Sequence, residues 1–279
     1  MYPRLFELPW SVPYLGPITV YTYGVLLAAA YLLGLKLAMV RAERRGLDGV
    51  RVLDLGIYII IAALVGAKLL LLVVDFNQYW SNPSEIWSLL RSGGVFYGGL
   101  ILAVSVAFWY IARHGMPFWT TCDVFAPGIA LGHVTGRLGC FAAGCCYGRP
   151  TDVAWGVIFT NPLAAANVGT PLGIRLHPTQ LYEAGAELLI LVLLLATERR
   201  GRTFPGRTFW SYMFLYAVSR YIIEIYRGDP RGVVPFLDIS TSQFISLVLG
   251  PLSLIMLFWL SRTLPTAPQE TRHRRRAAA

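Results

Sequence analysis

Charged residues are scarce in this sequence. Asp, Glu, Lys and Arg make up 14% of its 279 residues, whereas 56% of the residues are hydrophobic. A soluble domain usually carries charges at about a quarter of its positions. The shortage of charge argues against a soluble globular protein, and the distribution of the apolar residues excludes one, although the length alone is compatible with one or two soluble domains.

Cysteine is also rare, and the N-terminal stretch lacks the marks of a cleavable signal peptide. Four cysteines in a chain of this length do not make the dense pattern of a small secreted disulfide scaffold. Residues 1–17 contain Arg4 and Glu7 but no short apolar core before a small-residue cleavage site. We expect the first apolar helix itself to direct insertion. No internal repeat is visible, so one membrane domain is predicted.

Long apolar runs, in contrast, are abundant. Runs with few or no charges occupy residues 53–74, 100–111, 188–196 and 244–260. Several belong to stretches of about 20 residues, enough to cross a hydrocarbon core of roughly 30 Å. We predict an all-α polytopic membrane protein with about seven transmembrane helices. Their predicted ranges are 17–40, 52–74, 94–113, 120–141, 179–198, 208–226 and 242–261.

The basic residues that give the net charge of +9 are concentrated in alternate loops of this arrangement. Of the 24 Lys and Arg residues, 14 lie in four segments on one side: 41–51, the region of Arg113, 199–207 and 262–276. This positive-inside pattern predicts an N-terminus outside and a C-terminus in the cytoplasm. The basic balance indicates contact with anionic membrane lipids, and no nucleic acid is expected as a partner.

The predicted organisation is one domain with two long outer-side segments, followed by a tail. Residues 1–264 form a single transmembrane domain, and residues 265–279 form a disordered basic cytoplasmic tail. Two long segments face the outer side, at 75–93 and 142–177. The first is typical of an amphipathic interfacial segment, and the second is too polar to span and is expected to include short strands around 155–159.

Charged and titratable side chains inside membrane helices are expensive and often functional. Arg137 lies near the outer end of the fourth predicted helix, among glycines, and a guanidinium suits a phosphate because it donates in a plane. The alternative is an arginine that extends to the interface. His133 precedes it by four residues, on the same helix face. It is either a proton acceptor near neutral pH or a hydrogen-bonded core histidine.

Two more polar blocks lie in the fifth and sixth predicted helices. Arg220, Glu224 and Arg227 share one helix face through i, i+4 and i, i+3 spacing. They form either a purely structural ion network or part of a functional site. In residues 177–183, Pro178 fits the first helical turn. Helix initiation explains that proline but not Glu183.

Three of the four cysteines lie within seven residues, at Cys140, Cys145 and Cys146. Together with His133 and His177 they suggest a metal site, because thiolate and imidazole suit zinc or copper. The Cys-x4-Cys-Cys spacing is not a standard zinc pattern, so no metal is predicted. Apolar packing of Cys140 and a disulfide at Cys145 or Cys146 are the alternatives.

These blocks, in this order, resemble the prolipoprotein diacylglyceryl transferase family. The likeness extends from Tyr21 to Gln243 and depends on several pieces together. These are Gly-Arg-Leu-Gly at 136–139, Gly-Arg-Pro-Thr-Asp-Val at 148–153 with Trp155, His-Pro-Thr-Gln-Leu-Tyr-Glu at 177–183, and Glu-Ile-Tyr-Arg at 224–227. The resemblance implies a multi-pass enzyme of the bacterial plasma (inner) membrane, with residues 1–264 as its catalytic domain.

The resemblance also implies a reaction and its partners. The family moves the diacylglyceryl group from phosphatidylglycerol to the lipobox cysteine thiol of a prolipoprotein, and glycerol phosphate leaves. The expected partners are phosphatidylglycerol, the prolipoprotein signal peptide with its lipobox, and membrane lipids. No metal or soluble cofactor is expected.

The resemblance further suggests which residues bind the substrate. It implies that Arg137 and Arg227 hold the lipid head group and that Tyr23 is the family's functional tyrosine. The predicted substrate-binding set is completed by Glu224, Gly98 and Gly99.

Three positions depart from the family's pattern. Tyr97 stands where the family has a histidine before two glycines, Cys140 replaces an asparagine, and Cys145 replaces a glutamate. A phenol with a reference pKa of about 10 is a poor base near neutral pH. We therefore predict that His133 acts as general base or orienting group, while Tyr97 keeps a hydrogen-bonding role. The predicted catalytic set is Tyr97, His133, Arg137 and Arg227.

Two other functional classes fit part of the pattern. One is a non-catalytic or differently acting lipid-binding or transport membrane protein that kept the arginine site. The other is a thiol-redox membrane protein that uses Cys140, Cys145 and Cys146.

Overall fold

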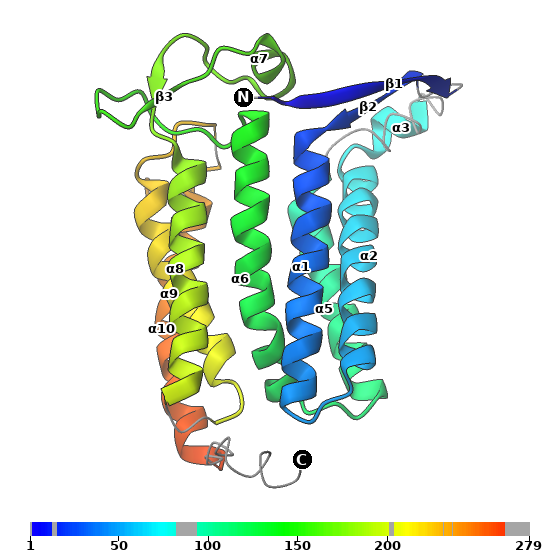
Figure 1. The fold of residues 1–279 in the computed structure, drawn as a ribbon, viewed down its shortest axis with the longest axis vertical. Helices are drawn as coiled ribbons and strands as arrows, with labels where there is room; N and C mark the ends of the chain where they lie inside the picture. Colours follow the sequence, from blue (N-terminus) through cyan, green and yellow to red (C-terminus); the bar gives the residue numbers. More distant parts are fainter. Residues whose placement is uncertain are drawn as a thin grey trace, which may run out of the picture. The chain divides into compact units, whose positions relative to one another are not determined.

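The computed structural model describes residues 2–12, 16–81, 94–200, 204–230, 232–235 and 237–265, and this part is mostly helical (Figure 1). Every range predicted to be a helix is occupied by a long helix. These are α1 (Thr22–Arg44), α2 (Gly49–Val74), α5 (Phe96–Arg113), α6 (Phe118–Ala143), α8 (Thr179–Arg200), α9 (Arg207–Glu224) and α10 (Thr241–Thr263).

Five of the described helices are long and apolar enough to cross a membrane: α1, α2, α5, α8 over Thr179–Glu198, and α10. Only 11% of the α2 span is buried inside the protein, so its apolar surface is left for lipid. The coarse prediction of an all-α multi-pass membrane protein is therefore confirmed. Helices α6 and α9 carry the buried ionic groups described below and are not among the five.

The first helix begins later than predicted. Residues 16–21 form strand β2 (Gly16–Tyr21), which pairs with β1 (Arg4–Val12), and α1 begins only at Thr22. The β-branched Thr19 and Val20, followed by Tyr21, favour an extended chain over a helix. A backbone hydrogen bond of 3.0 Å from Thr22 N to Pro3 O fixes the start of the helix beside β1.

The two segments predicted to face the outer side contain short elements. Strands β3 (Val157–Ile158) and β4 (Arg175–Leu176) pair antiparallel, which confirms the strand expected near residues 155–159. Helix α7 (Pro162–Val168) lies between them and is capped by the Asn161 side chain. Helix α3 (Phe76–Ser81) begins the other segment. The rest of that segment, residues 82–93, and the predicted tail from 266 onward lie outside the described residues.

The backbone contacts divide the chain into two compact units. The first comprises residues Met1–Phe6, Val20–Leu37 and Cys122–Ala279, and the second comprises Glu7–Thr19 and Ala38–Thr121. In the first unit α9 packs against both α8 and α10. A buried core of Ala126, Ala130, Ile190, Leu194 and Tyr212 joins α6, α8 and α9. This packing holds the three helices that carry the polar residues of the candidate site.

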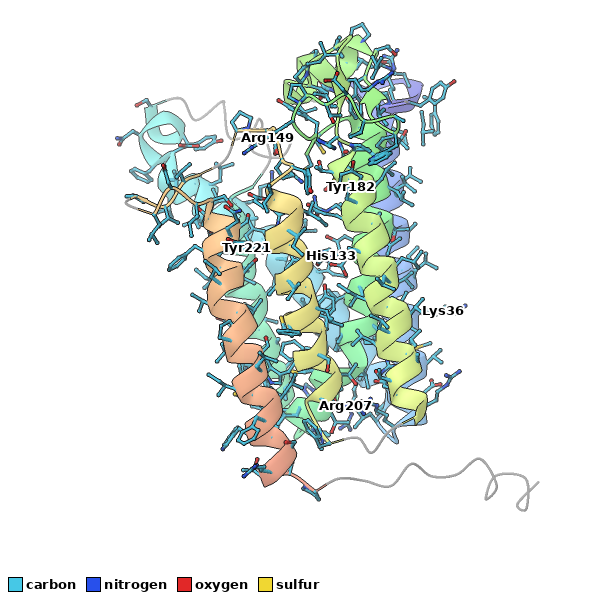
Figure 2. The ribbon with its side chains drawn as sticks, turned by 90° about the vertical axis from the view of Figure 1, so that its left-hand side faces the viewer. Lys36, His133, Arg149, Tyr182, Arg207 and Tyr221 are labelled. Carbon is cyan, nitrogen blue, oxygen red and sulfur yellow. The ribbon has the colours of Figure 1, made fainter. Side chains whose placement is uncertain are left out.

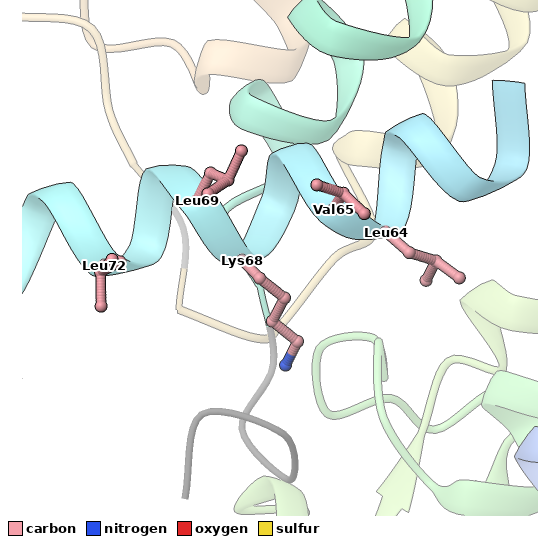
Figure 3. Close-up of a pocket in the computed structure, with 5 residues that line it drawn as sticks. All are labelled: Leu64, Val65, Lys68, Leu69 and Leu72. Atoms are coloured by element: carbon pink, nitrogen blue, oxygen red, sulfur yellow. The ribbon is translucent and has the colours of Figure 1, made fainter. Parts of the chain in front are cut away.

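In the second unit α2 packs closely on α5 through small residues. A Cβ atom on Gly99 would lie 2.7 Å from the Ala63 carbonyl oxygen, and Gly98 faces Gly66 in the same way. Glycine is needed here because the two backbones touch, a common device where membrane helices pack. The outer surface of α2 has a hollow of about 300 Å³, lined by Leu64, Val65, Lys68, Leu69 and Leu72 (Figure 3).

Candidate functional site

Three guanidinium groups meet on one buried carboxylate in the first unit. Glu183 of α8 accepts hydrogen bonds at Oε1 from Arg220 Nη1 of α9, at 2.6 Å, and from Arg227 Nη1, at 3.1 Å. Its other oxygen, Oε2, is paired with Arg137 Nε of α6. The structure thus brings together the two arginines predicted to hold a head group. These four residues are called the arginine cluster below.

Two further carboxylates balance the charge of the arginine cluster. Glu224 Oε2 lies 2.8 Å from Arg220 Nη2. Asp229 accepts from Arg227 through both oxygens, at 2.8 Å from Nε and 2.9 Å from Nη2. Buried charges are tolerated when each has a partner of opposite sign. Asp229 was not predicted, although its position two residues after Arg227 is the signal that would have pointed to it.

The two predicted head-group arginines differ in what they still offer to a ligand. The Arg227 side chain is 2% exposed and is held on both sides by Glu183 and Asp229. The Arg137 side chain is 20% exposed and uses Nε for Glu183. Within the described part of the chain, its two Nη groups donate no hydrogen bond. Arg137 is therefore the guanidinium with planar donors left for a phosphate.

The loop after α6 is tied to the elements that carry the arginine cluster. Gly148 N donates to His177 O at 3.0 Å, and Gly228 N donates to Tyr147 O at 3.1 Å. A Cβ atom on Gly148 would lie 2.5 Å from that His177 oxygen, so only glycine fits. These bonds fix the loop between the start of α8 and the chain that follows α9.

Aromatic side chains near this loop connect two of the sequence motifs, the one at 148–153 with Trp155 and the one at 177–183. Trp155 Nε1 donates to Tyr182 OH at 2.7 Å, and His177 Nδ1 lies 3.0 Å from the same oxygen. Figure 2 shows Tyr182 and Arg149 toward one end of the first unit, Arg207 toward the opposite end, and His133 between them.

Three thiols gather beside the arginine cluster. Cys140 lies in the last turn of α6, and Cys145 and Cys146 lie on the loop that follows. Their sulfur atoms are all within 4.8 Å of one another, and all four cysteines of the chain are free thiols. Hydrogen bonds from the Cys140 and Cys145 thiols lower the pKa of Cys146. The charges of Arg227 and Arg137 also lower this pKa, while burial opposes the shift.

Tyr23, in the second position of α1, lies against the same turn of α6. A Cβ atom on Gly139 would be 3.2 Å from Tyr23 Cδ2, so the tyrosine ring covers this glycine. Tyr23 also interacts electrostatically with Cys140 and Cys145. The structure therefore places Tyr23 beside the thiols and within the same unit as the arginine cluster.

His133 belongs to a polar network between α6, α8 and α9. Its Nδ1 lies 3.0 Å from Glu187 Oε1 and 3.1 Å from Tyr212 OH. Its ring stacks on Tyr216, with 5.5 Å between the ring centroids. Tyr216 interacts electrostatically with Arg220 and Glu183, which links this network to the arginine cluster. A carboxylate beside Nδ1 favours the tautomer that leaves Nε2 basic.

Sequence reasoning missed Glu187, Tyr212 and Tyr216. Glu187 follows Glu183 by four residues on a largely apolar helix, so both carboxylates face the same side. A second acidic residue at membrane depth was the available signal for it. The two tyrosines gave none, because aromatic residues are common in such helices.

Tyr97, Gly98 and Gly99 belong to the second unit. Tyr97 lies in the first turn of α5 and is 47% exposed. The close approach of α2 accounts for the two glycines as packing residues. The predicted roles of these three residues with the substrate stay predictions.

Comparison with known proteins is consistent with these features. The family model for prolipoprotein diacylglyceryl transferase matches residues 11–259. The chain is 39% identical to the phosphatidylglycerol–prolipoprotein diacylglyceryl transferase of Clostridium tetani, over 88% of this chain and 93% of that protein. It is 30% identical to the enzyme of the same name from Synechococcus elongatus, over 90% of this chain and 88% of that protein. The chain therefore belongs to the prolipoprotein diacylglyceryl transferase family.

Proposed function

We propose that this chain transfers the diacylglyceryl group of phosphatidylglycerol to the lipobox cysteine of a prolipoprotein, with the arginine cluster as the head-group site. The observation that carries this proposal is the convergence of Arg137, Arg220 and Arg227 on Glu183 among apolar helices. The relatives are named phosphatidylglycerol–prolipoprotein diacylglyceryl transferases, and these names support the same two substrates.

The proposed reaction needs an anionic sulfur and a stabilised leaving group. A thiol with a reference pKa of about 8.5 must become a thiolate before it attacks carbon. The new C–S bond forms at the glyceryl carbon as the C–O bond to the phosphate breaks, and glycerol phosphate leaves. The Nη groups of Arg137 stabilise the charge that develops on the phosphate oxygens. Holding both reactants in the membrane, close together and oriented, supplies much of the remaining rate enhancement.

The proposed orientation follows from the placement of charge. Seven helices span the inner membrane in this proposal, with the N-terminus outside, residues 1–264 as one catalytic domain and the tail in the cytoplasm. The Arg-rich loops on one side support this topology. The lipid enters the site sideways from the bilayer, while the signal peptide presents its lipobox at the interface. In this arrangement Tyr23 and Glu224 border the head-group site.

The transfer assay tests the proposed function directly. Purified full-length protein, given phosphatidylglycerol labelled in its glyceryl group and a lipobox peptide, is expected to move the label to the peptide thiol. A peptide with serine in place of the lipobox cysteine is the matched control and should stay unlabelled. Retention of labelled lipid without transfer would contradict the proposal and favour the lipid-binding or transport alternative.

His133 is the proposed general base, and Glu187 is its positioning residue. The 3.0 Å contact between Nδ1 and Glu187 supports a fixed ring with Nε2 free to take the thiol proton. We expect His133→Gln to lower kcat by about 100-fold or more, since general bases typically contribute this much. Transfer rates of the variant and the wild type are compared between about pH 6 and 9.

The matched comparison for His133 is Tyr97→Phe, after both variants are shown to insert and fold. If His133→Gln keeps full turnover across the pH range, His133 is a hydrogen-bonded core histidine only. If Tyr97→Phe alone is inactive, the phenol is the working group and the proposed roles are reversed.

A further inference from the structure

We propose that Cys140, Cys145 and Cys146 bind one thiophilic divalent metal ion, such as zinc, and that the fourth position of this ion takes the thiol of the prolipoprotein substrate. The second half of this inference depends on the proposed function, because it gives the metal a substrate thiol to hold. The first half, the three-thiol site, depends only on the geometry of these cysteines.

The three sulfurs are close to the spacing that one metal ion requires. All lie within 4.8 Å of one another. A tetrahedral zinc site with Zn–S bonds of about 2.3 Å places its sulfurs about 3.8 Å apart. An inward movement of at most about 1 Å closes the site, and side-chain rotation supplies that movement. The structure therefore brings three possible metal ligands together, which the unusual Cys-x4-Cys-Cys spacing did not predict.

The loop that carries two of these cysteines has a strained and firmly held backbone. Cys146 has a φ of +63°, in the left-handed region that residues other than glycine seldom adopt. Thr179 Oγ1 donates to Cys146 O at 2.8 Å, and Gln180 Nε2 donates to Cys145 O at 2.7 Å. Both donors are fully buried. Strain held in place by buried donors is typical of functional positions. Packing of small apolar side chains requires no such arrangement.

The coordination number points to a reactive metal site. Among the residues that the structure describes, no histidine or carboxylate joins the three thiols as a fourth ligand. Structural zinc sites have four protein ligands, whereas catalytic sites have three and keep one position open. Three thiolates and a divalent ion leave one negative charge, and Arg137 and Arg227 interact with these thiols. The charge that a fourth, substrate thiolate adds would face the same arginines.

A metal in this position supplies what the proposed reaction needs. A thiol that coordinates a divalent ion loses its proton, which would go to the base proposed above. The coordinated sulfur then forms the C–S bond with one of its electron pairs. The C–O bond to the phosphate breaks, and its electron pair leaves with glycerol phosphate. The neutral thioether product is a weaker ligand and leaves the metal. No oxidation or reduction occurs.

The site is tested with cobalt as a spectroscopic substitute for zinc. The full-length protein, purified in detergent with its thiols reduced and freed of metal by a chelator, is titrated with Co²⁺. We expect one ion per chain, with near-ultraviolet sulfur-to-cobalt absorption. Each of Cys140→Ser, Cys145→Ser and Cys146→Ser should weaken binding by at least about 10-fold, since even outer-shell changes cost this much. Cys122→Ser is the matched control and should bind as the wild type does.

The fourth position is tested by adding the lipobox peptide to the cobalt-loaded protein. We expect the visible cobalt bands to shift with the cysteine peptide and to stay unchanged with its serine counterpart. Absence of the sulfur-to-cobalt absorption, with all thiols shown to be reduced, overturns the metal site. If the visible cobalt bands do not shift when the cysteine peptide is added, the substrate thiol does not bind at the fourth position. A protein that binds cobalt through these cysteines but never transfers lipid would refute the proposed function and leave the metal site standing.

Discussion

Arg137→Lys is expected to lower kcat/KM for phosphatidylglycerol by about 100- to 1,000-fold, the cost of losing one oriented donor to a developing oxyanion. Lysine keeps the positive charge but replaces a planar fork by a point charge. Its single ammonium cannot pair with Glu183 and also present two Nη donors to a phosphate. The measurement is the rate of transfer of labelled diacylglyceryl to a lipobox peptide at several lipid concentrations.

The matched control for this substitution is Arg51→Lys. Arg51 pairs with Asp48 at 3.3 Å, and its side chain is 53% exposed, so the same change should leave transfer unaltered. If Arg137→Lys transfers lipid as fast as the wild type, then Arg137 contributes only charge and the head-group assignment fails. A loss confined to lower yield of inserted protein would instead assign the residue to stability.

Long apolar runs made the helices predictable, because each run extends over many residues and depends on no distant contact. The predicted start of α1, at residue 17, was wrong because the pairing of β2 with β1 overrides the apolar character of residues 17–21. Local propensity favours a strand there, but a single short run beside a long apolar helix gives a weak signal. The boundary therefore depended on a pairing between strands that sequence periodicity does not reveal.

The candidate site was predictable where polar residues interrupt apolar helices. Arg137, Arg220, Glu183 and Arg227 were each identified for this reason, and the structure brings them together. What the sequence did not show was which carboxylate each arginine meets, because the partners come from different helices. The Glu187 partner of His133 belongs to this class. Asp229 does not, because it follows its partner Arg227 by only two residues. The proximity of the three thiols also depends on the left-handed conformation at Cys146, for which the residue type gives no indication.

Glu183→Gln should destabilise the protein more than any substitution on its surface. Glu183 is the carboxylate on which three guanidiniums converge, and removing one partner of a buried ion pair typically costs about 3–5 kcal/mol. The amide keeps the size of the side chain but removes the negative charge. Arg137 and Arg220 are then left with less compensation in a buried setting. Thermal unfolding of the purified protein in detergent measures the loss.

Two comparisons separate charge from other effects of this substitution. Asp48→Asn removes a charge from an exposed pair and keeps the cap of α2, so it should cost less than about 1 kcal/mol. Glu183→Asp keeps the charge and shortens the side chain, and it should recover much of the stability that Glu183→Gln loses. If Glu183→Gln unfolds at the wild-type temperature, the three arginines do not depend on this carboxylate. In that case Glu224 and Asp229 are sufficient to hold Arg220 and Arg227 in place, and Arg137 needs no buried carboxylate partner.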